Sequence, residues 1–324
     1  MKLNKMCIFV PTRNNPELIS YFIKTVNNDL KQYNVDLYFY DTSSDLKTRS
    51  IVEYYSSKNI YYFLDHKYSD VTTDLKIVNG FTYLMNKYSY IWLCGDGYVP
   101  IIGDVIPKIR PYLESDYDLI HFIEKKYIDN KEYILLNNID FFKTCGWNVP
   151  LYGATILSSN LMKNIDFSLI YKDFKNSGFL YFHAIFASLD TTNKIAAINR
   201  VDTFITNPYK KTSTSYRPKS FSKFWFQSWP KAVFALPECY SPYKVSVCRM
   251  LGQNSDFFTL KSILVLRATK NLSYKIIKEN KKNILKVTDV PLSKFYLVAS
   301  IPIPILRFFR FCFKALKSTF RRLK

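Results

Sequence analysis

The sequence predicts an α/β protein: a mostly parallel sheet flanked by helices, followed by a basic C-terminal helical extension. In the first hundred residues, β-branched and aromatic runs alternate with amphipathic runs of about ten to fifteen residues, the pattern of βαβ units. No acidic residue occurs from Thr203 to Pro237, and helical periodicity returns beyond that stretch. With 324 residues, 48% of them hydrophobic, the chain can form a large core with an appendage.

The elements of the first hundred residues follow from local signals. Pro11 is expected to stop the first strand, and Asn15 is expected to cap the first helix, with Pro16 in its first turn. Leu18, Phe22 and Val26 repeat at helical spacing. The predicted strands are 5–12, 35–45, 59–65 and 89–97, and the predicted helices are 15–30, 46–57 and 72–88.

The pattern is less regular after residue 100. Residues 105–113 predict a helix that prolines interrupt, and residues 117–126 and 132–138 predict two strands. Residues 140–200 mix helix and loop, and residues 256–285 predict a partly amphipathic helical stretch.

The cysteines and the N-terminus indicate the compartment. The six cysteines show no CxxC pair and no metal-type spacing, which favours a reducing environment. The apolar run Met6–Val10 is too short for a signal peptide, and no stretch reaches the roughly 18 apolar residues of a spanning helix. We therefore expect a protein on the cytoplasmic side of a membrane.

The formal net charge of +20 implies an anionic partner: a phosphorylated substrate, a lipid surface or nucleic acid. Residues 301–324 carry seven cations and no acid. On a helix, residues 307, 310, 314, 317 and 321 would form one basic stripe opposite Phe309, Cys312, Leu316, Phe320 and Leu323. This layout is typical of a helix on an anionic membrane, and the alternative is a helix packed on its own domain.

Polar residues end the predicted strands. Residues 11–14, 41–45 and 95–97 and Asp65 follow successive strands, and the carboxyl ends of parallel strands share one edge of a sheet. Asp96 stands between Gly95 and Gly97, so it either caps a turn or faces a ligand beyond the strand end. Several acidic strand ends in register favour the ligand.

These strand ends resemble those of the GT-A glycosyltransferases, particularly the family-2-like bacterial polysaccharide enzymes. The resemblance rests on VPTRNN at 10–15, YDTSSD at 40–45 and WLCGDGYVP at 92–100, in the family's order. It covers about residues 5–105 well, and residues 105–240 only in general layout. It implies a nucleotide-sugar donor, with the base and ribose held by Pro11, Thr12, Arg13, Asn14 and Asp41.

Two of the implied roles have alternatives. The Asp41 carboxylate can accept the N–H of a uracil ring, which favours a UDP-sugar, or it can cap an Asx-turn. Lys76 can reach a phosphate, or it can be a solvated surface lysine.

The metal site departs from the family pattern. The resemblance implies Mn²⁺ or Mg²⁺ on the last acid of a DxD motif, and that position falls on Gly97 or Tyr98. Asp96 alone provides few oxygen ligands for a metal ion, so it either holds the metal through water or binds the sugar or ribose instead. Cations of the acid-free stretch can then neutralise the leaving group.

An inverting transfer also needs a general base. The family's Glu-Asp pair is absent, and the nearest candidates are Asp173 and His183. A core histidine and a loop cap are their alternatives. Trp147 and Tyr152 can stack on an acceptor sugar or belong to the core.

Four regions are predicted: a nucleotide-sugar half (1–105), an acceptor half (106–240), a helical extension (241–300) and a membrane-surface helix (301–324). The predicted activity moves a sugar from a nucleoside diphosphate to a lipid-linked glycan at the inner face of a bacterial membrane, in capsule, exopolysaccharide or O-antigen synthesis. The alternative is a non-catalytic GT-A-like scaffold. Nucleic-acid binding is disfavoured, because no module for it is present.

Overall fold

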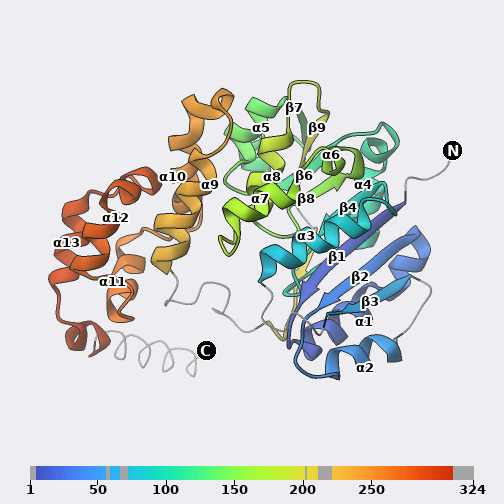
Figure 1. The fold of residues 1–324 in the computed structure, drawn as a ribbon, viewed down its shortest axis with the longest axis horizontal. Helices are drawn as coiled ribbons and strands as arrows, with labels where there is room; N and C mark the ends of the chain where they lie inside the picture. The colour runs from blue at the N-terminus through green and yellow to red at the C-terminus, as the bar shows by residue number, and fades with distance from the viewer. Residues whose placement is uncertain (1–4, 56–58, 66–71, 201–202, 211–220, 309–324) are drawn as a thin grey trace. The chain divides into compact units, whose positions relative to one another are not determined.

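The structure is a computed structural model that describes residues 5–55, 59–65, 72–200, 203–210 and 221–308. The chain forms two compact units (Figure 1). The first comprises residues 1–211 and 236–241, and the second comprises residues 212–235 and 242–324. The first unit holds the sheet with its helices, and the second is helical.

An eight-stranded sheet with the order β3-β2-β1-β4-β8-β6-β9-β7 forms the centre of the first unit. All neighbours are parallel except those of β8 and β7, which run against the other six strands. A second sheet pairs β5 with β10 in antiparallel fashion. The strands are β1 (Met6–Thr12), β2 (Val35–Asp41), β3 (Ile60–Leu64), β4 (Tyr90–Leu93), β5 (Tyr98–Pro100), β6 (Leu119–Ile123), β7 (Tyr133–Leu136), β8 (Thr155–Ser158), β9 (Ile195–Asn199) and β10 (Phe204–Thr206).

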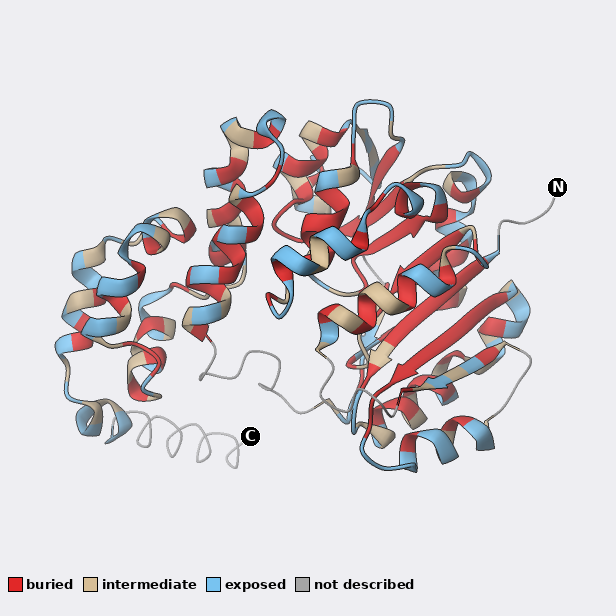
Figure 2. Cartoon of the chain, in the orientation of Figure 1, coloured by how far each residue is buried: buried red, intermediate tan, exposed pale blue. Residues whose placement is uncertain are grey.

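Helices cover both faces of the large sheet, and its central strands are buried (Figure 2). One face packs on α1 (Pro16–Tyr33), α2 (Lys47–Tyr54) and α4 (Ile102–Glu114), which share one apolar cluster with the strands. The other face meets α3 (Thr73–Leu84), α5 (Asn138–Cys145) and α8 (Leu180–Ser188). The ring contacts Phe9–Phe81 and His121–Phe141 and the hydrogen bond from Tyr181 Oη to the Thr155 carbonyl oxygen join these helices to β1, β6 and β8. A Cβ on Gly80 would lie 2.1 Å from the Phe9 ring, so only glycine allows this close packing.

Several predicted elements differ from the structure. Pro11 does not stop β1, because the strand continues to Thr12 and Pro11 pairs with Tyr40. The helix predicted at 105–113 begins earlier, as α4, and runs through Pro107 and Pro111. Residues 140–200 contain β8 and β9, which were not predicted because both strands are short and buried.

The remaining helices of the first unit are α6 (Ser159–Lys163) and α7 (Phe167–Phe174).

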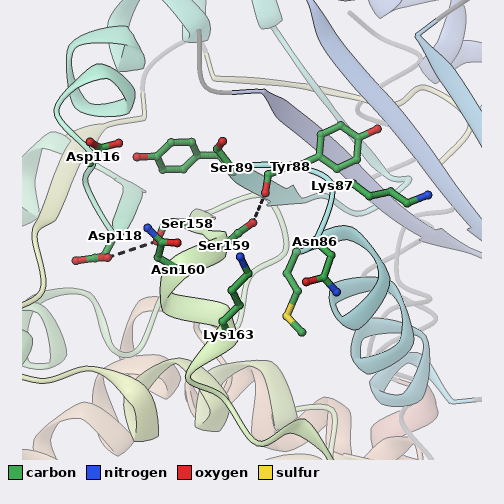
Figure 3. A pocket seen from close by; sticks show the side chains of 12 residues that line it. Asn86, Lys87, Tyr88, Ser89, Asp116, Asp118, Ser158, Ser159, Asn160 and Lys163 are labelled. Atoms are coloured by element: carbon green, nitrogen blue, oxygen red, sulfur yellow. Dashed lines mark hydrogen bonds between the residues drawn. The ribbon is translucent and has the colours of Figure 1, made fainter. Parts of the chain in front are cut away.

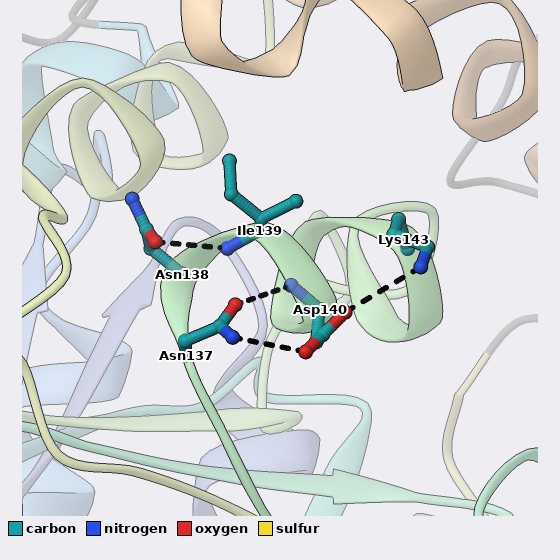
Figure 4. A network of polar contacts seen from close by, with 5 residues as sticks. All are labelled: Asn137, Asn138, Ile139, Asp140 and Lys143. Carbon is teal, nitrogen blue, oxygen red and sulfur yellow. Dashed lines mark hydrogen bonds and ion pairs between the residues drawn. The ribbon is translucent and has the colours of Figure 1, made fainter.

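The start of helix α5 shows how local sequence determines where a helix begins (Figure 4). The Asn137 side chain accepts from the Asp140 backbone N–H at 2.8 Å and donates to the Asp140 carboxylate at 2.9 Å. Lys143 then pairs with that carboxylate at 3.4 Å, one turn later.

The second unit contains α9 (Trp229–Phe234), α10 (Lys244–Asn254), α11 (Leu260–Ala268), α12 (Tyr274–Val287) and α13 (Leu292–Ser300). The helical stretch predicted at 256–285 is thus divided between α11 and α12. Among the described residues, no helix combines the length and apolarity of a membrane span. Residues 303–308 are helical, and most of the predicted membrane-surface helix lies outside the described residues.

Candidate active site at the carboxyl edge of the sheet

Asp96 joins the ends of two neighbouring strands. It follows β4, and its carboxylate accepts hydrogen bonds from Thr12 Oγ1 at 3.0 Å and from Asn15 Nδ2 at 2.8 Å. Asn15 stands at the N-cap position of α1, but its side chain makes no capping bond and binds Asp96 instead. The aspartate between two glycines therefore connects β4 to the loop that follows β1.

Asp41 is completely buried at the end of β2. Its Oδ1 accepts from the Ser43 backbone N–H at 2.9 Å and from the Ser43 hydroxyl, and its Oδ2 accepts from the Tyr62 hydroxyl at 2.7 Å. This is the Asx-turn that the sequence left as an alternative. Through its bonds to Ser43, Asp41 thus holds the shape of the loop 42–44. The pKa of Tyr62 is raised, first by burial and second by its hydrogen bond to Asp41.

The loop after β1 lies against the loop after β2. The Asn14 backbone N–H donates to Ser43 Oγ at 2.7 Å, and Asn14 Oδ1 accepts from the Ser44 backbone N–H at 3.1 Å. Arg13 and Asn14 are exposed, Pro11 is half-buried and Thr12 is buried. The residues predicted to hold base and ribose are therefore adjacent, with Arg13, Asn14 and Ser44 facing solvent.

Lys76 is not the solvated lysine that the sequence left as an alternative. Its side chain is buried on the first turn of α3, and Nζ donates to the Thr12 carbonyl oxygen at 2.7 Å. Burial lowers its pKa to about 8, while the carboxylates of Asp41 and Asp96 oppose that shift. Lys76 fixes the end of β1 and lies in the electrostatic field of both acidic strand ends.

Asp74 is a buried carboxylate that the sequence analysis did not single out. Its Oδ2 accepts from the Gly178 backbone N–H at 3.0 Å, which ties α3 to the turn before α8. No hydrogen-bond partner of Oδ1 occurs in the described part of the chain. Burial raises the pKa of Asp74 to about 6, although backbone N–H groups of that turn oppose the shift.

The loop after β10 closes the other side of the Asp96 turn. The buried Asn207 donates from Nδ2 to the carbonyl oxygens of Asp96, at 3.2 Å, and Leu18, at 2.9 Å. Its backbone N–H donates to the Gly97 carbonyl oxygen at 3.1 Å. Asn207 carries no local sequence signal, because its partners lie more than a hundred residues earlier in the chain.

Of the two aromatic candidates, Tyr152 lies beside the site. A Cβ on Gly95 would contact the Tyr152 side chain at 3.8 Å, and Tyr152 is only half-buried. Trp147 is buried, donates to the Thr144 carbonyl oxygen at 3.2 Å and packs edge-to-face on Tyr127, so it belongs to the core.

Asp173 and His183, the two candidates for the general base, lie near each other but outside the group of acidic strand ends. Both line a pocket of about 230 Å³ beside α7 and α8, whose lining residues include none of the acidic strand ends. His183 is buried and stacks on Phe174 at a centroid distance of 4.0 Å. Asp173 is exposed on α7.

The donor set at Asp96 does not fit a divalent metal well. Mn²⁺ and Mg²⁺ need several oxygen ligands, and one Asp96 oxygen already accepts two hydrogen bonds. Among the described residues, no group of three or more acidic, histidine or cysteine side chains can hold a metal ion.

A larger polar pocket opens at the opposite, amino edge of the sheet (Figure 3). Its volume is about 290 Å³, and Tyr90, Asp118 and Lys163 are among the residues that line it. It lies where β4 and β6 begin, whereas ligands of parallel sheets bind where strands end. We therefore place the candidate site at the carboxyl edge.

No protein-family model and no curated protein sequence matches this chain. Solved structures do match. One is S. aureus TarS 1-349 in complex with UDP-GlcNAc, at 9% identity and a TM-score of 0.59, covering 91% of this chain and 90% of that one. Another is the mannosyltransferase PcManGT from Pyrobaculum calidifontis in complex with GDP-Man and Mn²⁺, at 11% identity and a TM-score of 0.51, covering 91% and 87%. These similarities and the sheet order confirm the GT-A fold that the three strand-end motifs predicted.

Proposed function

We propose that this protein is a glycosyltransferase that takes a sugar from a nucleoside-diphosphate donor. The observation that carries the proposal is the group formed by Thr12, Asn15 and Asp96 beside the Asp41 loop, at the carboxyl edge of a GT-A sheet. Donor binding at this edge is what the sheet topology favours. Two structures with the same fold contain UDP-GlcNAc and GDP-Man, which supports a nucleotide sugar as the donor.

Within this proposal, the loops after β1 and β2 hold the nucleotide, with a UDP-sugar favoured. Arg13, Asn14 and Ser44 are the exposed groups there, and Asp41 keeps their loop in shape. Asp96 orients the ribose or the sugar, since its carboxylate is fixed by two donors.

The transfer is proposed to invert the anomeric carbon, and Asp173 is the candidate for its general base, although it lines a separate pocket beside α7 and α8. Asp173 is an exposed carboxylate on α7, just before the turn that Asp74 holds. His183 is assigned to packing, because it is buried against Phe174. An Asp173→Asn variant should bind the donor normally and lose transfer; unchanged transfer would remove Asp173 from this role.

The test of the activity is a panel of nucleotide sugars presented to the purified protein. We expect one donor to bind and its nucleotide to be released slowly even without acceptor, through hydrolysis. A protein that binds a nucleotide sugar but never releases the nucleotide, with any acceptor, would be the non-catalytic scaffold. Failure to bind every nucleotide and nucleotide sugar would reject both functions.

We also propose a lipid-linked glycan acceptor, in capsule, exopolysaccharide or O-antigen synthesis, at the inner face of the membrane. The support is charge: α12 carries five lysines and one glutamate, and residues 301–324 carry seven cations and no acid. Exposed apolar side chains, Leu297 and Phe308, occur in the same unit. An anionic lipid surface fits this combination.

Co-sedimentation with phosphatidylglycerol vesicles tests the membrane proposal. The full chain should pellet at low salt and less at high salt, because each cation near the surface contributes about 1 kcal/mol. Removal of residues 301–324 should release the protein while UDP or GDP binding persists. Equal pelleting of both forms would show that the tail does not anchor the protein.

A further inference from the structure

A lysine of the segment after β10 packs against the Asp96 turn, at the position where the family that the strand ends resemble has a metal-binding acid. We propose that Lys210 binds the diphosphate of the donor and neutralises the leaving group, so that donor binding does not require a divalent metal. This inference rests on the proposed function and specifies how its donor site works. It starts from the mismatch between Gly97 and Tyr98, which have no carboxylate, and a metal that needs several.

Backbone hydrogen bonds hold Lys210 against the Asp96 turn. The Asn207 backbone N–H donates to the Gly97 carbonyl oxygen at 3.1 Å, and the Lys210 backbone N–H donates to the Asn207 carbonyl oxygen at 3.0 Å. Pairing of Thr206 with Tyr98, between β10 and β5, fixes the register of the two segments. The segment 207–210 is therefore attached to residues 96–98 at several points.

Lys210 occupies the space that a side chain at residue 97 would need. A Cβ on Gly97 would lie 2.9 Å from Lys210 Cδ and 3.1 Å from Cε. An acid at residue 97 and the present position of the lysine stem therefore exclude each other without a shift. The same packing therefore accounts for the missing metal-binding acid at residue 97 and for the lysine beside it.

The ammonium group remains suited to a phosphate. Nζ lies 3.4 Å from the centroid of the Tyr98 ring, and that tyrosine is 44% exposed. An ammonium group over an aromatic face is attracted by the electron density of the ring, which limits its motion. Lys76, the other lysine near Asp96, is buried and already donates to the Thr12 carbonyl oxygen, so Lys210 is the better phosphate ligand.

The chemistry requires no further reactant. As the acceptor oxygen forms its bond to the anomeric carbon, the bond from that carbon to the β-phosphate oxygen breaks, and the electron pair leaves with the nucleoside diphosphate. The acceptor proton goes to the general base. The Lys210 ammonium stabilises the charge that grows on the departing diphosphate.

Calorimetry with UDP, GDP and their nucleosides, in EDTA and again with Mn²⁺, tests the inference. Wild-type protein should bind one of the two diphosphates in EDTA, and Lys210→Met should weaken that binding about tenfold, as expected for a charge-assisted bond. Lys210→Arg should restore most of the affinity, and binding of the nucleoside should not change. Lys163→Met is the matched control, because it removes an exposed lysine at the opposite edge of the sheet.

A second variant covers the case in which Lys210→Met does not fold. Gly97→Asp displaces the flexible lysine stem and adds a carboxylate, so its diphosphate binding should weaken in EDTA and recover with Mn²⁺. The inference is overturned if wild-type binding disappears in EDTA and returns with Mn²⁺, or if Lys210→Met binds as well as wild type. Absence of any nucleotide binding by wild type would instead reject the proposed function.

Discussion

Two buried aspartates on the same strand show how the two edges of the sheet differ. Asp36 lies near the start of β2, where it accepts from Tyr88 Oη at 2.9 Å and Asn59 Nδ2 at 3.0 Å and pairs with Lys5 at 2.9 Å. Asp41 lies at the end of β2, where its partners are Ser43 and Tyr62. Both carboxylates are at most 2% exposed, so burial alone does not distinguish them.

The partners distinguish them. Asp36 pairs directly with a cation and binds residues that precede strands β1, β3 and β4. Its role is to stabilise the fold. Asp41 and Asp96 accept hydrogen bonds from hydroxyl and N–H groups, and the buried cation Lys76 donates to the Thr12 carbonyl oxygen instead of to either acid. The buried acids at the carboxyl edge therefore hold polar loops in place, and the buried acid at the amino edge holds the strands together.

The largest expected effect is on stability at the amino edge. Asp36→Ala should lower the free energy of unfolding by about 2–4 kcal/mol, because the buried Tyr88 donor and the half-buried Asn59 donor lose their acceptor. Denaturant unfolding measures the change. Nucleotide affinity should stay at the wild-type value, and a loss of affinity in the folded variant would contradict the division between the two edges.

Asp74 gives the next effect, and it depends on pH. Its pKa in the folded protein, about 6, lies above the ordinary value of 3.8. At a pH between these two values, unfolding therefore releases a proton. Stability should therefore fall as pH rises from about 4 to about 6 and then level off, by on the order of 2–3 kcal/mol.

Asp74→Asn should remove this contribution and leave the protein more stable than wild type at pH 7. Thermal unfolding at several pH values measures it, with Asp45→Asn, an exposed acid on the loop after β2, as the control. A wild-type pH profile in Asp74→Asn would assign the dependence to other groups.

At the carboxyl edge we expect an effect on affinity. Asp41→Ala removes the acceptor of Ser43 and Tyr62, so the loop 42–44 loses its shape. Because Asp41 acts on the nucleotide only through this loop, the affinity for UDP or GDP should fall about tenfold, or about 1.4 kcal/mol. Calorimetry on the folded variant decides, and unchanged affinity would remove Asp41 and its loop from the nucleotide site.

The smallest expected effect is that of Thr12→Val, which keeps the side-chain shape and removes one donor to Asp96. Asn15 still holds the carboxylate, so nucleotide affinity should fall by only about 1 kcal/mol. Combining Thr12→Val with Asn15→Ala should cost more than the two single losses added together. Strict additivity would show that these donors do not act on one shared carboxylate.

The sequence by itself determined the first half of the fold. Strand–helix alternation predicted β1, α1, β2, α2, β3, α3 and β4, because amphipathic periodicity and turn residues are local properties of a chain. It also identified the strand ends that carry Thr12, Asp41 and Asp96. Short strands buried on both faces, such as β8 and β9, have no such period and were missed.

Only the tertiary structure decided which groups meet. Asn15 looked like a helix cap until the approach of β4 provided Asp96 as a partner, and Lys76 looked solvated until α3 packed on β1. Asn207 and Lys210 reach the Asp96 turn through the pairing of β10 with β5, more than a hundred residues apart in sequence. Long-range pairing depends on the packing of the whole core, so a local pattern cannot show which side chains it brings together.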